Sequence, residues 1–279
     1  MRLFEVLLDN QTFIAPTSGP QFRVTFNVLI DFGGLNTYAD ISFYNLSQDT
    51  ANRAFALQTT INLRAGYNNT IDTIFNGKIF NVFKERRGPD TITRVIARGG
   101  TSFEKPIINQ TFGTNANIVE LIRACCTSIG YPVVIDASQF SDVRPYATGY
   151  SLSGDPLRKL EQLANTHNFS FVLDNDSIVI VRNDAFRGGS PVEVSEATGM
   201  EGIPEISEVG CNVTTRLNPK IRIGGRIDIK SQFRTVNFSN VYYVDVPASA
   251  GTGLYRVFKL THSGDSWGDE WSTRIESKR

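Results

Sequence analysis

The chain has 279 residues, of which 41% are hydrophobic and 20% are charged, a composition typical of a globular protein that buries a core. Lysine and arginine together number 28, as do aspartate and glutamate, so the basic excess of a dedicated nucleic-acid binder is absent. The three cysteines form neither a disulfide framework nor a zinc-ligand spacing, and they indicate reduced, partly buried thiols. No run approaches the roughly 18 apolar residues of a membrane span, and we expect neither a signal peptide nor membrane insertion.

The first hundred residues are predicted to form strands. Residues 22–28 place Phe22, Val24, Phe26 and Val28 in alternation with polar residues, and this period of two predicts a half-buried strand. Segments rich in β-branched and aromatic residues predict further strands at 37–47, 60–69, 72–88 and 90–100. A short helix or turn over 48–58 has Ser47 or Asp49 as its cap. Strands at this spacing indicate an all-β barrel or sandwich.

Residues 101–184 predict a small α+β unit. One helix is expected to start at the N-cap Asn115 and to end at Gly130, before Pro132. A second helix has Asp155 as its cap and Pro156 in its first turn. Apolar side chains recur at helical spacing in both: Ile118, Leu121, Ile122, Cys125 and Ile129 in the first, and Leu157, Leu160, Leu163 and Ala164 in the second. The sequence DNDS at 174–177 then predicts a tight hairpin.

A glycine- and proline-containing linker at 184–191 separates this unit from a second β region. The strands predicted in this region are 205–217, 220–232, 241–247, 253–265 and 270–279. Gly224 and Gly225 would allow a tight bend or bulge between apolar neighbours. The predicted fold class is mainly β with an α+β insert, and the predicted domains are 1–100, 101–184 and 185–279.

The stretch THSGDSWGDEW at 261–271 gathers a histidine, serines, acids and both tryptophans, but its spacing does not suit catalysis. Neighbouring side chains on a strand point to opposite faces, so His262 would not reach Ser263 as a base. We therefore expect His262 at a strand end, bonded to backbone or water. The acids at 265, 269 and 270 lack the alternation of a calcium loop.

Other candidate sites have structural interpretations as well. His167 stands at the end of a predicted helix, where it interacts favourably with the helix dipole. The basic segment at 83–88 predicts a solvated hairpin end, and the glycine pairs predict turns. We therefore predict no enzyme, and no catalytic, cofactor-binding or metal-binding residue.

Three segments resemble the tail hub proteins of tailed phages: 41–100, 203–232 and 253–278. These are baseplate hub subunits similar to those of T4 and Mu, and they are related to the hub part of type VI secretion spikes. The resemblance is carried, in order, by YNLS at 44–47, AGY at 65–67, IFNGKI at 74–79, LNPKIRIGG at 217–225, KLTHSGD at 259–265 and WSTRI at 271–275.

The resemblance implies a homotrimer. Each chain would contribute two β-barrel domains similar to a tail-tube subunit, flanking the α+β domain, so three chains would form a pseudo-sixfold ring. The ring would join the sixfold tail tube to the threefold central spike. Its partners would be the tube or distal tail protein, the spike and the tape-measure protein, with DNA only in transit through a lumen that we expect to be polar and not net basic.

The resemblance also implies a place in the virion, after assembly in the host cytoplasm, and no cofactor. Alternatives are another virion tail protein, such as a distal tail, tube or spike-base adaptor protein, or a tail-associated cell-wall hydrolase. Residues 254–260 and 271–275 would be antiparallel strands with a loop between them. Trp267 and Trp271 are then candidate packing or subunit-contact anchors.

Overall fold

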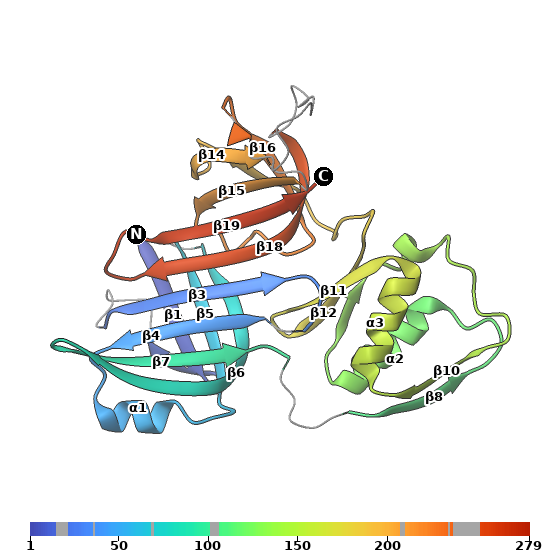
Figure 1. Cartoon of the computed structure of the whole chain (residues 1–279), viewed down its shortest axis with the longest axis horizontal. Helices are drawn as coiled ribbons and strands as arrows, with labels where there is room; N and C mark the ends of the chain where they lie inside the picture. Colours follow the sequence, from blue (N-terminus) through green and yellow to red (C-terminus); the bar gives the residue numbers. More distant parts are fainter. Residues whose placement is uncertain are drawn as a thin grey trace.

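The fold is given by a computed structural model, which describes residues 1–14, 22–35, 37–67, 70–100, 106–206, 210–233, 235–236 and 252–279. It is mainly β with an α+β insert, as the sequence predicts (Figure 1). The expected strand at 241–247 lies outside the described residues.

The described residues of the N-terminal region contain one short helix, α1 (Gln48–Ala54), among strands. Ser47 is its N-cap, since the Ser47 side chain accepts a hydrogen bond from the backbone N–H of Thr50. The strands are β1 (Arg2–Leu8), β2 (Gln11–Ile14), β3 (Val24–Asp31), β4 (Tyr38–Tyr44), β5 (Thr60–Tyr67), β6 (Thr70–Arg87) and β7 (Asp90–Arg98).

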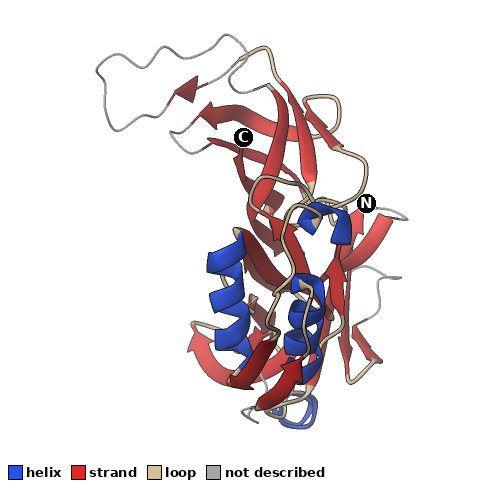
Figure 2. Ribbon diagram, turned by 90° about the vertical axis from the view of Figure 1, so that its right-hand side faces the viewer, coloured by secondary structure: helices blue, strands red, loops and turns tan. Residues whose placement is uncertain are grey.

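The insert packs two helices of equal length against short strands, and Figure 2 shows these helices from the insert's side of the molecule. Its elements are β8 (Ile108–Phe112), α2 (Ile118–Ile129), β9 (Val133–Ile135), the 3₁₀ helix η2 (Ala137–Phe140), β10 (Tyr150–Gly154), α3 (Pro156–His167), β11 (Phe169–Asp174) and β12 (Ser177–Arg182). The predicted hairpin is confirmed, because β11 and β12 pair antiparallel around a turn at which Asn175 has φ 55°.

One predicted cap in the insert is wrong. The N-cap of α2 is Asn117, whose side chain accepts from the N–H of Val119 while Glu120 reaches back to the cap, which completes a capping box. Asn115 instead has φ 64° and donates its N–H to the carbonyl of Tyr146. Asparagine suits both positions, and the spacing to Glu120 distinguishes them.

The C-terminal region is again β. Its strands are β13 (Val192–Ser195), β14 (Met200–Ile206), β15 (Gly210–Arg216), β16 (Arg226–Lys230), β17 (Thr235–Val236), β18 (Gly253–Asp265) and β19 (Trp271–Lys278). Two predicted boundaries need correction. Residues 220–225 form turns, with the N–H of Gly225 donating to the carbonyl of Arg222, so β16 starts later than expected. The strand predicted at 253–265 is confirmed as β18, whereas the shorter interval 254–260 ends too early, because His262 to Asp265 belong to β18 and not to the following loop.

A single sheet runs through both β regions in the order β17-β14-β15-β19-β18-β3-β4-β7-β6-β5-β1-β2 among the described residues. The two regions meet where β3 pairs antiparallel with β18, and Asn27 is the register partner of Ser263. In Figure 1 the strands from β19 to β6 form the near layer, and β1 and β5 lie behind it. The main core fills the space between these layers.

The hairpin β11–β12 joins the insert to this body, because its two faces serve two cores. Phe171, Leu173, Ile178 and Ile180 face the helices of the insert. Val172, Val179 and Val181 point the other way and belong to the main core. The period of two along a strand produces this division. The assignment of 1–100, 101–184 and 185–279 as separate domains stays a prediction.

Candidate functional site

The near layer of the sheet has one apolar and one polar face. Strands β3, β4, β15 and β19 each alternate strictly between buried residues and more exposed ones. The buried set enters the main core, whereas the other set carries mainly Thr, Ser, Asn and charged side chains. Register pairing aligns these residues across eight strands, from β14 to the second half of β6. We call this surface the polar face.

Charges on the polar face nearly balance. On its strands, the cations are Lys78, Arg87, Arg94, Arg98, Arg216, Lys259, Arg274 and Lys278. Its anions, equal in number, are Asp31, Asp40, Glu85, Asp90, Glu201, Glu205, Asp265 and Glu276. Several are paired, as where Arg94 Nη2 lies 2.5 Å from Asp40 Oδ2 and Lys259 Nζ lies 3.2 Å from Glu276 Oε1. Arg23, just before β3, adds one cation, and its guanidinium pairs with Asp265 and lies over the ring of Tyr44. The surface is therefore polar with an excess of a single positive charge.

The polar face ends at strand edges that have no ladder partner in the described part of the chain. Residues 80–87 of β6 pair with β7 on one side and with no described strand on the other. At the far end, residues 200–204 of β14 have β15 on one side, and β17 reaches only Glu205 and Ile206. Unpaired edges expose backbone N–H and C=O groups that can pair with another strand.

The junction of the two β regions is packed around Trp271. Its side chain is buried, with the ring centroid 5.3 Å from that of Phe26 in an edge-on arrangement and 6.5 Å from that of Phe4. A Cβ on Gly264 would collide with the ring of Phe26 and lie 2.9 Å from Cε3 of Trp271, so glycine is needed for this close packing. Trp271 thus joins the N-terminal and C-terminal strands.

His262 lies in the middle of the same junction and not at a strand end. The imidazole is buried, and Nδ1 shares a 2.8 Å hydrogen bond with the hydroxyl of Thr273 on the neighbouring strand. Burial lowers the pKa of His262 to about 4, and the nearby Arg222 acts in the same direction. A buried neutral histidine bonded to a threonine is a structural group and contacts no described carboxylate that could orient it as a base.

The loop after β18 is anchored on Asp265. Its carboxylate receives Nε and Nη2 of Arg23 at 3.2 and 2.7 Å, and Oδ1 also accepts the N–H of Trp267 at 3.0 Å. Burial alone would raise the pKa of Asp265, but the bonds from Arg23, Trp267 and Gly268 outweigh it and the pKa is lowered. Trp267 itself is 65% exposed.

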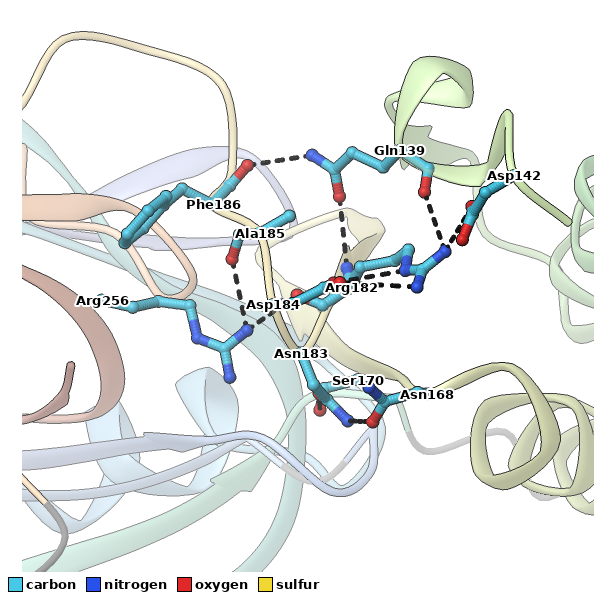
Figure 3. A network of polar contacts seen from close by, with 10 residues as sticks. All are labelled: Gln139, Asp142, Asn168, Ser170, Arg182, Asn183, Asp184, Ala185, Phe186 and Arg256. Carbon is cyan, nitrogen blue, oxygen red and sulfur yellow. Dashed lines mark hydrogen bonds and ion pairs between the residues drawn. The ribbon is translucent and has the colours of Figure 1, made fainter.

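Polar bonds attach the insert to the C-terminal strands (Figure 3). Arg182 donates through Nη1 to Asp142 at 2.6 Å and to the carbonyl of Gln139 at 3.2 Å. Arg256, on β18, donates to the carbonyl of Arg182 at 2.8 Å and to that of Ala185 at 3.3 Å. Burial lowers the pKa of Arg256, whose guanidinium donates to backbone carbonyls in place of water.

A second attachment centres on the buried carboxylate of Asp174, at the tip of the β11–β12 hairpin. Arg187 in the linker reaches Oδ2 at 2.5 Å, and Arg222 in the C-terminal region reaches Oδ1 at 3.4 Å. Arg222 also pairs with Asp72 on β6 at 3.1 Å. Four segments distant in sequence therefore meet at one charge cluster.

His167 ends α3, as predicted, and its Nε2 shares a 2.7 Å hydrogen bond with the hydroxyl of Tyr146. The three cysteines are free and buried, and burial raises the pKa of Cys125 to about 11 and of Cys126 to about 12. Across the described ranges, His, Cys, Asp and Glu side chains form no group of three or more that could hold a metal ion. No helix in those ranges combines the length and apolarity needed to cross a membrane.

Comparison with solved structures places this fold among phage tail proteins. A tail protein of prophage MuSo2 from Shewanella oneidensis has a TM-score of 0.62 at 8% identity, over 100% of this chain and 97% of that one. A tail protein from Neisseria meningitidis MC58 has a TM-score of 0.63 at 8% identity, over 100% and 96%. The E. coli c3393 protein, a type VI secretion component described as similar to the T4 tail proteins gp27 and gp5, has a TM-score of 0.57 at 10% identity, over 98% and 76%.

The family assignment is more specific. The family Baseplate hub gp41 matches residues 38–244, which is most of the chain, and the chain belongs to this family. It is therefore a structural protein of a phage tail or baseplate and a component of the virion. No curated protein matches the sequence. The resemblance to tail hub proteins inferred from the sequence is confirmed.

Proposed function

We propose that three copies of this chain form the hub ring of a phage tail or baseplate, joining the sixfold tail tube to the threefold central spike. The observation that carries the proposal is the sheet that passes through both β regions without a break at the β3–β18 junction. Each region would act as one tube-like barrel unit, so three chains would supply six units around the ring.

Ring closure would use the strand edges at the two ends of the polar face. Residues 80–87 of β6 and residues 200–204 of β14 lie at opposite ends of the polar face, so copies arranged head to tail would bring one edge against the other. Such heterologous contacts form a closed ring when the rotation between neighbouring copies is a whole fraction of a full turn. The polar face would then line the lumen.

The lumen would pass DNA and the tape-measure protein without retaining them. Nearly equal numbers of cationic and anionic side chains on the polar face give almost no excess for neutralising phosphates. The other partners are the tube or distal tail protein on one side of the ring and the spike on the other. The protein would assemble in the host cytoplasm, take no cofactor, insert in no membrane and catalyse no reaction.

The test is the mass and shape of the purified protein. Mass photometry across a concentration series should give a species of three times the 31.0 kDa chain mass. Negative-stain images should show a threefold ring with six lobes and a central hole. Because edge pairing uses main-chain hydrogen bonds, the ring should persist when salt is raised to screen surface ion pairs. A protein that stays monomeric at micromolar concentrations, and joins neither tube nor spike, would contradict the proposal.

A further inference from the structure

The loop joining β18 to β19, residues 266–270, holds an indole in water. Trp267 is 65% exposed, whereas Trp271 at the end of the same loop is 2% exposed. A large aromatic ring in solvent forgoes the favourable transfer that burial would give, at about 25 cal/mol per Å² of apolar surface. Isolated exposed apolar residues are common on proteins, so exposure alone assigns no role.

What distinguishes this loop is how tightly it is fixed from both sides. Asp265 accepts the N–H of Trp267 at 3.0 Å, and the N–H of Asp265 donates to the carbonyl of Glu270 at 2.8 Å. Ser266 exchanges bonds with Val24, because its hydroxyl accepts the N–H of Val24 at 2.9 Å and its own N–H donates to the carbonyl of Val24 at 2.9 Å.

The N-terminal strand supplies a further fixation. Arg2 donates to the carbonyl of Gly268 at 2.5 Å and to that of Asp269 at 2.7 Å, and its guanidinium lies 5.9 Å from the ring centroid of Trp271. Segments from both ends of the chain thus fix the backbone of a five-residue loop. An aromatic side chain on a fixed backbone loses little conformational freedom when it binds, which is the property of an interface anchor.

The surroundings indicate what chemistry would bind there. Asp269 and Glu270 are exposed, and neither carboxylate takes part in an ion pair among the described residues. The guanidinium of Arg2 is directed to backbone carbonyls and that of Arg23 to Asp265. An indole beside two unpaired carboxylates is complementary to an apolar pocket bordered by lysine or arginine.

The position of the loop decides whether the partner is a second copy of this chain or a different protein stacked on the ring. The loop lies at the end of the sheet where the chain begins, and the insert lies at the opposite end (Figure 1). β18 and β19 are in the middle of the strand order, far from the free edges of β6 and β14 that would meet a second copy. In the proposed ring, Trp267 lies at the strand ends in the middle of the sheet. Its side chain would therefore face along the ring axis, toward the protein that stacks on that end.

We propose that Trp267, flanked by Asp269 and Glu270, anchors the ring to the adjoining tail protein by entering an apolar pocket with a basic border. This inference rests on the proposed ring. It adds the residues and the chemistry of one end-on contact, and it assigns different roles to the two tryptophans: Trp271 packs the junction and Trp267 binds the neighbour.

The test uses assembled particles of the phage that carries this protein, with the chromosomal gene deleted and the chain supplied from a plasmid. A photo-crosslinking amino acid at position 267 should join this chain to a different tail protein on illumination, at a peptide containing lysine or arginine. Trp267→Ala should lower the yield of complete tails at least tenfold, and Trp267→Phe should restore part of it. The double change Asp269→Asn with Glu270→Gln should lower it less than Trp267→Ala.

Ring formation by the isolated chain separates this inference from the proposed function. Trp267→Ala protein should form the same oligomer as the wild type, since the contact lies outside the strand edges. Crosslinks only to other copies of this chain, or no crosslink in complete tails, would overturn the inference and leave the ring standing. Normal tail yield with Trp267→Ala would overturn it as well. A wild-type chain that forms no ring at all would instead contradict the proposed function.

Discussion

Two tryptophans four positions apart meet opposite environments, and substitution should distinguish them. Trp271→Ala removes a ring packed between Phe26 and Phe4, and we expect the free energy of unfolding to fall by about 3–5 kcal/mol, since a large cavity opens in the junction. Urea denaturation followed by circular dichroism measures this change. Trp267→Ala is the matched control, and it should change the free energy of unfolding by less than about 0.5 kcal/mol. Equal losses in the two variants would refute the division of roles.

The buried imidazole of His262 should make stability depend on pH. The unfolded chain binds a proton at this residue below pH 6.5, whereas the folded chain, with a pKa of about 4, does not until lower pH. Stability therefore falls as pH drops through this window, by about 2 kcal/mol between pH 7 and pH 5 for this residue alone. His262→Gln should reduce the pH-dependent loss by that amount, as measured by urea denaturation at the two pH values.

The other histidine provides the comparison. Burial also lowers the pKa of His167, which lies at the surface end of α3 and bonds to Tyr146. Its smaller desolvation predicts that His167→Gln changes the pH dependence less than His262→Gln does. If both variants lost as much stability as the wild type on acidification, the conclusion that His262 is buried and neutral in the folded chain would be contradicted.

At the scale of elements, local sequence patterns predicted whether a segment forms a strand or a helix better than they predicted the residues at which it begins and ends. Alternation identified β3, and Asn/Asp turn chemistry identified the β11–β12 hairpin, because these signals lie in adjacent residues. The shorter interval 254–260 ends β18 too early, because a glycine such as Gly264 is typical of a turn when only its neighbours are considered. In the fold this glycine sits in a strand, where it makes room for the rings of Phe26 and Trp271. That requirement comes from residues far away in the chain.

The sites themselves could be predicted only in part. Both tryptophans were singled out from their place in the stretch 261–271 between two expected strands, but nothing in the sequence could show that one is buried and the other exposed. The β3–β18 junction and the Asp174 cluster were missed for the same reason, since each joins segments that only the folded chain brings together. Pairing partners are set by global topology and leave no periodic signal in one strand.

The Asp174 cluster predicts how firmly the insert is held. Asp174→Asn keeps the shape of the side chain but leaves Arg187 and Arg222 facing a neutral group at a buried site. We expect a loss of about 3–5 kcal/mol in the free energy of unfolding, together with faster hydrogen exchange in the β11–β12 hairpin, because removing one partner of a buried ion pair leaves uncompensated charge.

The control for this cluster is Asp72, the other ion-pair partner of Arg222. Its side chain is 57% exposed, so Asp72→Asn should cost less than about 1 kcal/mol. A small effect of Asp174→Asn, equal to that of Asp72→Asn, would show that packing of Val172, Val179 and Val181 holds the insert without help from the charges.

At the scale of the whole molecule, the formal net charge of zero has a specific distribution. The polar face carries nearly equal numbers of cations and anions, many of them in ion pairs, although a neutral chain could equally have gathered its basic residues there. A channel that conducts DNA benefits from this arrangement, because every additional cation that bound a phosphate in the lumen would slow transit. Changing the balance of charges on the polar face is therefore the way to test this role.

Glu85→Gln combined with Glu276→Gln removes two negative charges per copy from the polar face and frees Lys259 from its partner. We expect the wild-type protein to bind double-stranded DNA no more tightly than a Kd of about 10⁻⁴ M at physiological salt, and the variant to bind at least several-fold more tightly, with a steeper dependence on salt concentration. Fluorescence anisotropy with a labelled duplex across a salt series measures both.

Glu161→Gln with Glu196→Gln changes net charge equally but away from the polar face, and it should leave DNA affinity near that of the wild type. If both double variants bound DNA more tightly to the same extent, net charge and not the polar face would govern the interaction. A wild-type protein that already bound tightly at physiological salt would contradict a lumen built for transit.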